Sequence, residues 1–165
     1  MASKKGVIVT AIILAAITGA SFLLWIIPQD YETTFVVTDY EEYLDGVKNI
    51  HEVLEESTDI EYRNLQTGEI SPQEYITITE VTSSQVTAQI SEFITSKPPE
   101  QWQPSYINYM EALKKFNSYI GETKVLANLI ENDGSSEEKD RIIEKIESLK
   151  KESKEFVRIS DDLRP

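Results

Sequence analysis

The stretch TDYEEYLDGVKNIHEVL, residues 38–54, decides the fold class of this chain. Thr38 followed by Glu41 matches a capping box, in which a hydroxyl accepts a hydrogen bond from a backbone amide and the glutamate reaches back to the cap. Apolar side chains then recur at spacings typical of one helix face. They are Tyr40, Tyr43, Leu44, Val47, Ile50 and Leu54. The pattern predicts a helix that ends at Gly68.

A second helix is predicted from Ser71, Pro72 and Glu74, which combine a capping box with proline at the first helical position. Its expected core face consists of Tyr75, Ile78, Thr82, Val86, Gln89 or Ile90, and Phe93. Residues 75–82 are also rich in β-branched side chains that alternate with others, so a strand is the competing interpretation there. We expect a helix.

Two further helices follow the Lys-Pro-Pro break at residues 97–99. The third is expected to start near this break or at Pro104 and to end at the Asn-Asp-Gly turn of residues 132–134. Its apolar face is Trp102, Tyr106, Met110, Leu113, Phe116, Ile120, Ala127 and Ile130. Ser135 and Glu138 then form a capping box for the last helix. That helix carries a seam like that of a coiled coil: Ile142, Ile146, Leu149, Ser153, Phe156, Ser160 and Leu163.

Four amphipathic helices with short joints predict an all-α fold, because neighbours joined by few residues must run in opposite directions. We therefore expect an antiparallel four-helix bundle at residues 39–163, preceded by a connector at residues 28–38.

An N-terminal transmembrane helix is predicted at residues 6–27, which contain no ionisable side chain. The span follows Lys4 and Lys5, and basic residues near a span stay in the cytoplasm. Residues 1–5 are thus expected to be a cytoplasmic stub of a single-pass signal anchor, with the rest of the chain extracytoplasmic. The competing interpretation is a signal peptide cleaved near Gly19.

A small-residue face on this span consists of Ala11, Ala15 and Gly19, which are four residues apart. Such spacing lets two membrane helices approach closely, so these residues are candidates for helix packing within the membrane.

Charge and cysteine content exclude several classes of function. Residues 28–165 carry all 29 acidic side chains and, without Lys4 and Lys5, 14 of the 16 basic ones, for a net charge of −15. A field of that sign repels nucleic acid, so no nucleic-acid partner is expected. The chain has no cysteine and therefore no disulfide, no thiol nucleophile and no lipid-modified cysteine.

No catalytic, cofactor-binding or metal-binding residue is predicted. His51 is the only histidine, and we expect it at the surface or at the boundary of the core. Carboxylates between residues 52 and 61 lack the glycine and the spacing of a calcium loop. The best candidate for a partner surface is the joint that contains Pro98, Pro99 and Trp102, although Trp102 could instead cover the end of the core.

The N-terminal stretch MASKKGVIV, leading through the apolar span to Trp25-Ile26-Ile27-Pro28-Gln29, resembles the anchors of small uncharacterised membrane proteins of ammonia-oxidising archaea. The resemblance covers about thirty residues. It implies an archaeal cell envelope with the acidic domain facing the pseudo-periplasmic space. It implies no activity, cofactor or site residue.

These patterns together favour a membrane-anchored structural or accessory interaction module that is not an enzyme. Its partner would be another envelope or membrane protein, or a second copy of the chain. The alternative is a bundle that binds or senses a small molecule between its helices and signals through a membrane partner. A polar cavity between helices would favour that alternative, and a filled, dry core would oppose it.

Overall fold

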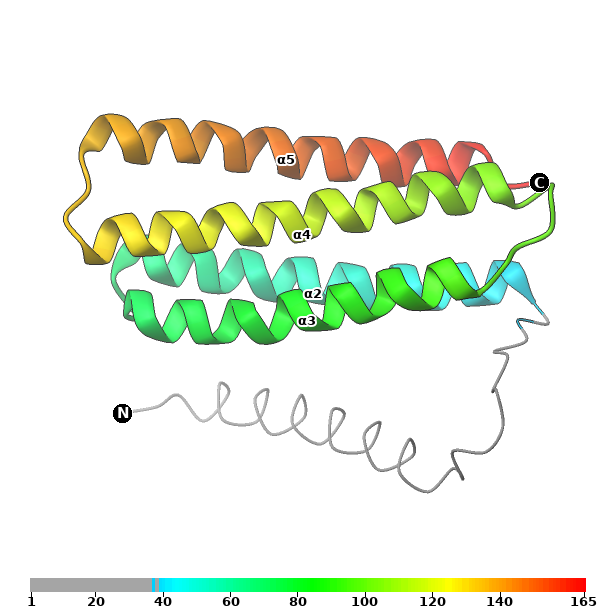
Figure 1. Cartoon of the computed structure of the whole chain (residues 1–165), viewed down its shortest axis with the longest axis horizontal. Coiled ribbons are helices and arrows are strands. Elements are labelled where there is room, and N and C mark those ends of the chain that lie inside the picture. The colour runs from blue at the N-terminus through cyan, green and yellow to red at the C-terminus, as the bar shows by residue number, and fades with distance from the viewer. Residues whose placement is uncertain (1–36, 38) are drawn as a thin grey trace, which may run out of the picture. The chain divides into compact units, whose positions relative to one another are not determined.

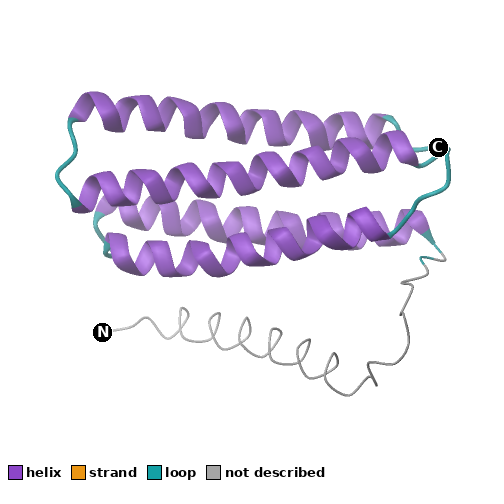
Figure 2. Cartoon of the chain, viewed as in Figure 1, coloured by secondary structure: helices purple, strands orange, loops and turns teal. Residues whose placement is uncertain are grey.

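The computed structural model describes residue 37 and residues 39–165 of the chain. This part contains four helices and no strand, which confirms the all-α prediction for the described residues (Figure 2). The helices are α2 (Tyr40–Thr67), α3 (Pro72–Thr95), α4 (Gln103–Glu131) and α5 (Ser136–Asp162). The predicted span at residues 6–27, with its small-residue face, lies outside the described residues. Among the described helices, none combines the length and the apolar character needed to cross a membrane.

Consecutive helices run in opposite directions and form a bundle, as short joints require (Figure 1). α4 is the central element, because it packs against α2, α3 and α5. α5 packs closely on α4, whereas only long side chains connect it to α2. The bundle therefore has an open flank between α2 and α5.

The start of α2 differs from the prediction by one residue. The N-cap is Asp39, not Thr38, and its carboxylate accepts hydrogen bonds from the amides of Glu41 and Glu42, each at 3.0 Å. An aspartate satisfies two amides at once and also places a negative charge at the positive end of the helix dipole. At the other end, Gly68 adopts the left-handed conformation with φ of 74°, as expected for a helix stop.

Residues 75–82 are helical, which resolves the ambiguity between helix and strand. The predicted capping box is present: Ser71 accepts from the amide of Glu74, whose carboxylate accepts from the amide of Ser71. Within α3, hydroxyls such as those of Thr77, Ser84 and Ser91 donate to carbonyls four residues earlier. The hydroxyl groups are thus satisfied by the helix itself, so the β-branched residues do not require a sheet.

The last two helices begin and end close to the predicted positions. α4 starts at Gln103 after Trp102, which provides no side-chain cap, and it ends before the turn of residues 132–134. In that turn Asp133 has φ of 53°, a conformation that aspartate tolerates. Ser135 and Glu138 form the predicted capping box of α5.

The core is rich in aromatic rings from α4. Tyr109, Phe116 and Tyr119 are at most 2% exposed and meet Tyr75 of α3 in the same cluster. Burial of each such ring contributes about 1.5 to 3 kcal/mol relative to exposure. Pairs such as Phe93 with Tyr106, whose centroids are 4.9 Å apart, extend this cluster towards the start of α2.

Two positions on the predicted core faces of α2 and α3 are wrong. Ile50 is 53% exposed, and His51 takes its place in the core at 4% exposure. Ile78 is 37% exposed, and Thr79 takes its place at 1%. In both cases the packing between helices turns the next residue in the sequence towards the core. This packing outweighs the expectation that the more apolar of two adjacent side chains is the buried one.

Small residues bring α4 and α5 together. Ser153 donates to the carbonyl of Ala112 at 2.9 Å, and Ser160 donates to the carbonyl of Ser105 at 2.9 Å. These hydrogen bonds from side chain to backbone need a close approach of the two helices, which short side chains allow. The predicted seam is therefore correct at Ser153 and Ser160, and wrong at Leu163, which is 42% exposed.

Candidate functional site

The flank between α2 and α5 is bridged by ion pairs. Lys48 of α2 contacts Asp161 of α5 at 2.6 Å. Two helical turns further along α2, Glu55 contacts Lys154 of α5 at 3.1 Å. Further along, Lys150 pairs with Asp59. These pairs are partly exposed, so each contributes about 0 to 1 kcal/mol to stability. They connect α2 and α5 through long side chains that reach across the flank between the two helices.

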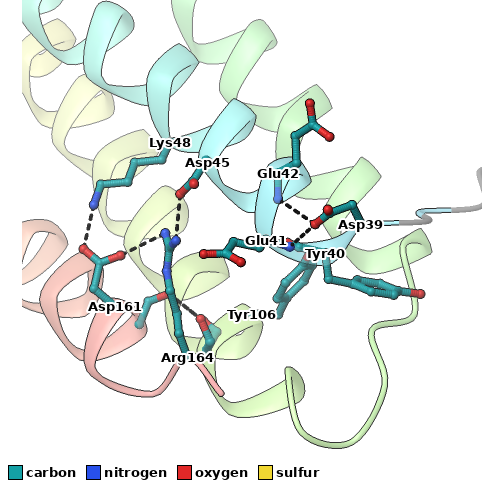
Figure 3. Close-up of polar contacts among 11 residues, drawn as sticks. Asp39, Tyr40, Glu41, Glu42, Asp45, Lys48, Tyr106, Asp161 and Arg164 are labelled. Carbon is teal, nitrogen blue, oxygen red and sulfur yellow. Dashed lines mark hydrogen bonds and ion pairs between the residues drawn. The ribbon is translucent and has the colours of Figure 1, made fainter.

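The C-terminal residues add a further link at the end of this flank. Arg164 contacts Asp45 of α2 at 2.7 Å and Asp161 of α5 at 3.0 Å (Figure 3). The guanidinium can hold two carboxylates because its donors are arranged in a rigid fork. The two ion pairs raise the pKa of Arg164 even though its partial burial acts in the opposite direction. The chain end is thereby tied to the first turns of α2.

A partly open cavity of about 130 Å³ lies on this flank. Its lining comes from three helices: Lys48, His51, Glu52, Glu55, Tyr109, Lys154 and Val157. The ion pairs Lys48 to Asp161 and Glu55 to Lys154 are two helical turns apart on α2, and His51 lies between them. The wall of the cavity therefore combines charged side chains of α2 and α5 with the buried ring of His51.

His51 is the buried polar group of this cavity. Its Nδ1 lies 3.0 Å from the hydroxyl oxygen of Tyr109, and its ring packs against Phe116 with centroids 4.8 Å apart. Burial lowers the pKa of His51 from 6.5 to about 4, so the ring is neutral at physiological pH. Burial likewise raises the pKa of Tyr109, which keeps its hydroxyl protonated.

The hydrogen bond between His51 and Tyr109 satisfies one nitrogen of the ring. The other nitrogen, Nε2, is buried and has no partner in the described part of the chain. A buried polar atom without a partner costs about 1 to 3 kcal/mol.

The prediction that His51 lies at the surface or at the boundary of the core is wrong, because the side chain is 4% exposed. The signal was nevertheless present: Leu44, Val47, His51, Leu54 and Thr58 follow one another at alternating spacings of three and four. A polar residue that continues such a series lies in the core. Ile50 is more apolar than the adjacent His51, so the spacing of apolar residues favoured Ile50 as the core residue.

The predicted partner surface at the joint before α4 lies at one end of the bundle. Trp102 is half-buried against the core, with its ring 6.2 Å from that of Tyr106 in an edge-to-face contact. Pro99 is exposed and lines an open depression with Glu100 and Gln101, whereas Pro98 is half-buried. Trp102 therefore packs over the end of the core.

A different apolar surface follows the seam between α2 and α3. We call it the α2–α3 strip, and it consists of Ile50, Val53, Ile60, Ile78 and Val81, with exposed fractions of 37 to 63%. Two ring contacts show the antiparallel register of α2 and α3. The ring centroids of Tyr62 and Tyr75 are 6.4 Å apart, and those of Tyr43 and Phe93 are 5.8 Å apart. This register places Ile60 near Ile78.

The flanks of the two helices put the members of the strip on one side. On α2, Lys48 and Glu55 mark the flank towards α5, and Ile50 lies on the opposite flank. On α3, Glu80 pairs with Lys124 of α4 at 3.1 Å, and Ile78 and Val81 lie away from that flank. The side chains of the strip carry no charge. On α3 the sequence between Val81 and Ser91 contains no ionisable residue, whereas on α2 carboxylates adjoin Val53 and Ile60 along the chain.

The described residues contain no group of three or more histidine, aspartate and glutamate side chains arranged to hold a metal ion. Comparison of the chain with known protein families, with curated proteins and with solved structures finds no match.

Proposed function

We propose that this protein is a membrane-anchored interaction module of the cell envelope that has no catalytic activity. Residues 6–27 would cross the membrane, Lys4 and Lys5 would stay in the cytoplasm, and the helical domain would lie outside. The observation that carries the interaction role is the α2–α3 strip. Large apolar side chains gathered on one surface of an acidic domain mark a contact site better than singly scattered ones do.

The partner that fits the strip best is a second copy of the chain. Residues 28–165 carry a net charge of −15, so two copies repel each other over most of their surface. The α3 half of the strip has no ionisable residue between Val81 and Ser91, so two copies that meet there oppose the fewest carboxylates. Tethering in one membrane raises the effective concentration of the copies, so that even a small contact surface is sufficient. Ala11, Ala15 and Gly19 would add a close helix contact within the bilayer.

The anchor is tested by fractionation of cells that express the full chain. We expect the protein to stay in the membrane pellet after alkaline carbonate extraction, and added protease to degrade the helical domain from the outside. Release of an N-terminally shortened protein into the soluble fraction would instead support a cleaved signal peptide and contradict the anchor.

The strip is tested with Val81→Glu and with the matched control Val125→Glu. Val81 and Val125 are 47% and 42% exposed, but Val125 lies on α4, away from the strip. In detergent solution, analytical ultracentrifugation should show a dimer for the unchanged chain and for the control. Val81→Glu should weaken the dimer about tenfold or more, since it places two carboxylates in the contact. Equal behaviour of both variants, or a monomeric unchanged chain, would contradict self-association through the strip.

The second candidate function is binding of a small molecule between the helices, with signalling through a membrane partner. The polar cavity between α2 and α5 is the observation that favours it, since a filled core would have opposed it. Both functions are compatible in one chain, because the strip and the cavity lie on opposite flanks of α2.

A further inference from the structure

The contact between α3 and α4 changes from polar to apolar along its length. Three polar contacts join the outer sides of the two helices: Gln73 with Glu131, Glu80 with Lys124, and Thr87 with Asn117. Each is seven residues, or about two turns, from the next on both helices. One further step of seven residues places Ile94 of α3 beside Met110 of α4. The row of polar contacts therefore ends in apolar side chains.

We call these apolar side chains the α3–α4 patch, which consists of Ile90, Ile94, Ile107 and Met110. Ile90 and Ile107 belong to it because residues three or four apart share one face of a helix. Ile94 is 64% exposed and Ile107 is 55% exposed, whereas Ile90 and Met110 are half-buried against the core. Ile78 and Val81 lie on the side of α3 away from α4, so the patch is separate from the α2–α3 strip.

The patch lies at the end of the bundle where the chain enters it. Ile94 is close to the end of α3, Ile107 is close to the start of α4, and the start of α2 lies at the same end (Figure 1). The hydroxyl of Tyr106 donates to the carbonyl of Tyr40, the first residue of α2, at 2.8 Å. The ring of Tyr106 also contacts Trp102, which is half-buried at this end. The start of α2, the joint and the patch are thus neighbours.

The length of the connector decides which end of the bundle an anchored chain holds near the bilayer. The connector, residues 28–38, has eleven residues, and a chain of that length spans at most about 36 to 40 Å. α2 has 28 residues and is about 42 Å long. If residues 6–27 cross the membrane, the connector is too short for the opposite end of the bundle to face the bilayer. The end that carries the patch is therefore the end that lipid can reach.

The charges around the patch decide which lipid fits it. The side chains of the patch are uncharged, and Glu111 beside it forms an ion pair with Lys114 at 2.7 Å. Along the chain, Glu92 and Lys97 on either side of Ile94 have opposite charges. The patch thus has no excess of positive charge for an anionic headgroup, and the net charge of −15 on residues 28–165 repels such headgroups. A surface of zwitterionic lipid avoids this repulsion.

We propose that the α3–α4 patch docks the helical domain on the surface of a membrane of zwitterionic lipid. Ile94 and Ile107 enter the headgroup region, and Trp102 lies at the headgroup level, which its ring and its N–H both favour. The docking rests on the membrane anchor of the proposed function. It does not depend on the α2–α3 strip, which stays free on the other side of α3 to contact a second copy.

The absence of cysteine makes the depth of single positions measurable. The full chain with Ile94→Cys or Ile107→Cys is labelled with the fluorophore NBD and reconstituted in nanodiscs of phosphatidylcholine. The quencher is phosphatidylcholine that carries a nitroxide near its headgroup. The control is Val125→Cys, because Val125 is 42% exposed and lies about 27 Å further along α4 than Ile107.

We expect the quencher lipid to lower the fluorescence of both patch labels about twofold or more, since interfacial groups enter about 5 to 10 Å into the headgroup boundary. The label at position 125 should keep its intensity. Adding Ile107→Asp to the chain labelled at position 94 should abolish the quenching, because a carboxylate opposes entry into lipid. Adding Val125→Asp, its matched control, should leave the quenching unchanged. Circular dichroism verifies that the variants are folded.

Four results would overturn the docking. The first is a chain that stays in the nanodiscs while its patch labels are not quenched. The second is equal quenching at position 125, and the third is unchanged quenching with Ile107→Asp. The fourth is shielding of the patch labels from iodide in solution without quenching by the lipid, which would identify a protein as the occupant. Loss of the chain from the nanodiscs would instead contradict the anchor, and the docking with it.

Discussion

At the scale of single residues, His51 makes the stability of the bundle depend on pH. Its pKa is lowered from 6.5 to about 4 by burial. Between these values the unfolded chain binds a proton that the folded chain does not, so stability falls as the pH falls through this range. Each pH unit changes the free energy of unfolding by about 1.4 kcal/mol at most. The total loss across the range is on the order of 3 kcal/mol.

Urea unfolding of the unchanged chain at several pH values measures this effect. The control is the double variant His51→Phe with Tyr109→Phe, which removes both partners of the hydrogen bond. Carboxylates titrate in both proteins, so the difference between them isolates His51. We expect the steeper pH dependence in the unchanged chain; parallel curves for the two proteins would show that the ring takes up its proton equally well in the folded state.

At the scale of helices, the contact between α4 and α5 depends on the size of Ser153. Ser153→Ala keeps the close approach and loses only the hydrogen bond to Ala112, at a cost of about 0.5 to 1.5 kcal/mol. Ser153→Leu must push the helices apart, at a cost of about 1 to 3 kcal/mol or more. Chemical denaturation should therefore rank leucine below alanine. The reverse order would mean that space is free at this position and that the hydroxyl matters only as a polar group.

The helices themselves were predictable from the sequence because their signals are local. The capping boxes at Ser71 and Ser135 and the stop at Gly68 need only residues within one turn of each other. The choice between Ile50 and His51 was not predictable in the same way. Both fit a helix face locally, and only the packing against Phe116 and Tyr109 decides which residue points inward.

At the scale of the whole molecule, the excess of negative charge opposes folding. The ion pairs between α2 and α5 are partly exposed and contribute little each, while the net charge of −15 on residues 28–165 repels over longer distances. Salt at about 1 M screens charges beyond about 3 Å. We therefore expect the melting temperature to rise from low salt to this concentration, as measured by circular dichroism. A lower melting temperature at high salt would show that the ion pairs outweigh the repulsion.

The candidate site is formed by residues that are far apart in the sequence and come together only in the folded bundle. Lys48, Glu55 and Lys154 are unremarkable charged residues in the sequence, and nothing local pairs α2 with α5. The α2–α3 strip was hidden for the same reason, because Ile50 and Ile78 fitted the core faces that the spacing predicted. Their exposure follows from the register between helices, which a single sequence does not reveal.

The link from Arg164 to Asp45 gives the bundle a particular response to mechanical load. The start of α2 and the end of the chain lie at the same end of the bundle (Figure 1). Pulling them apart would therefore separate α2 from α5 progressively, beginning at the guanidinium of Arg164, instead of sliding whole helices past each other. Such a geometry yields at low force, in small steps, with the Arg164 contacts breaking first.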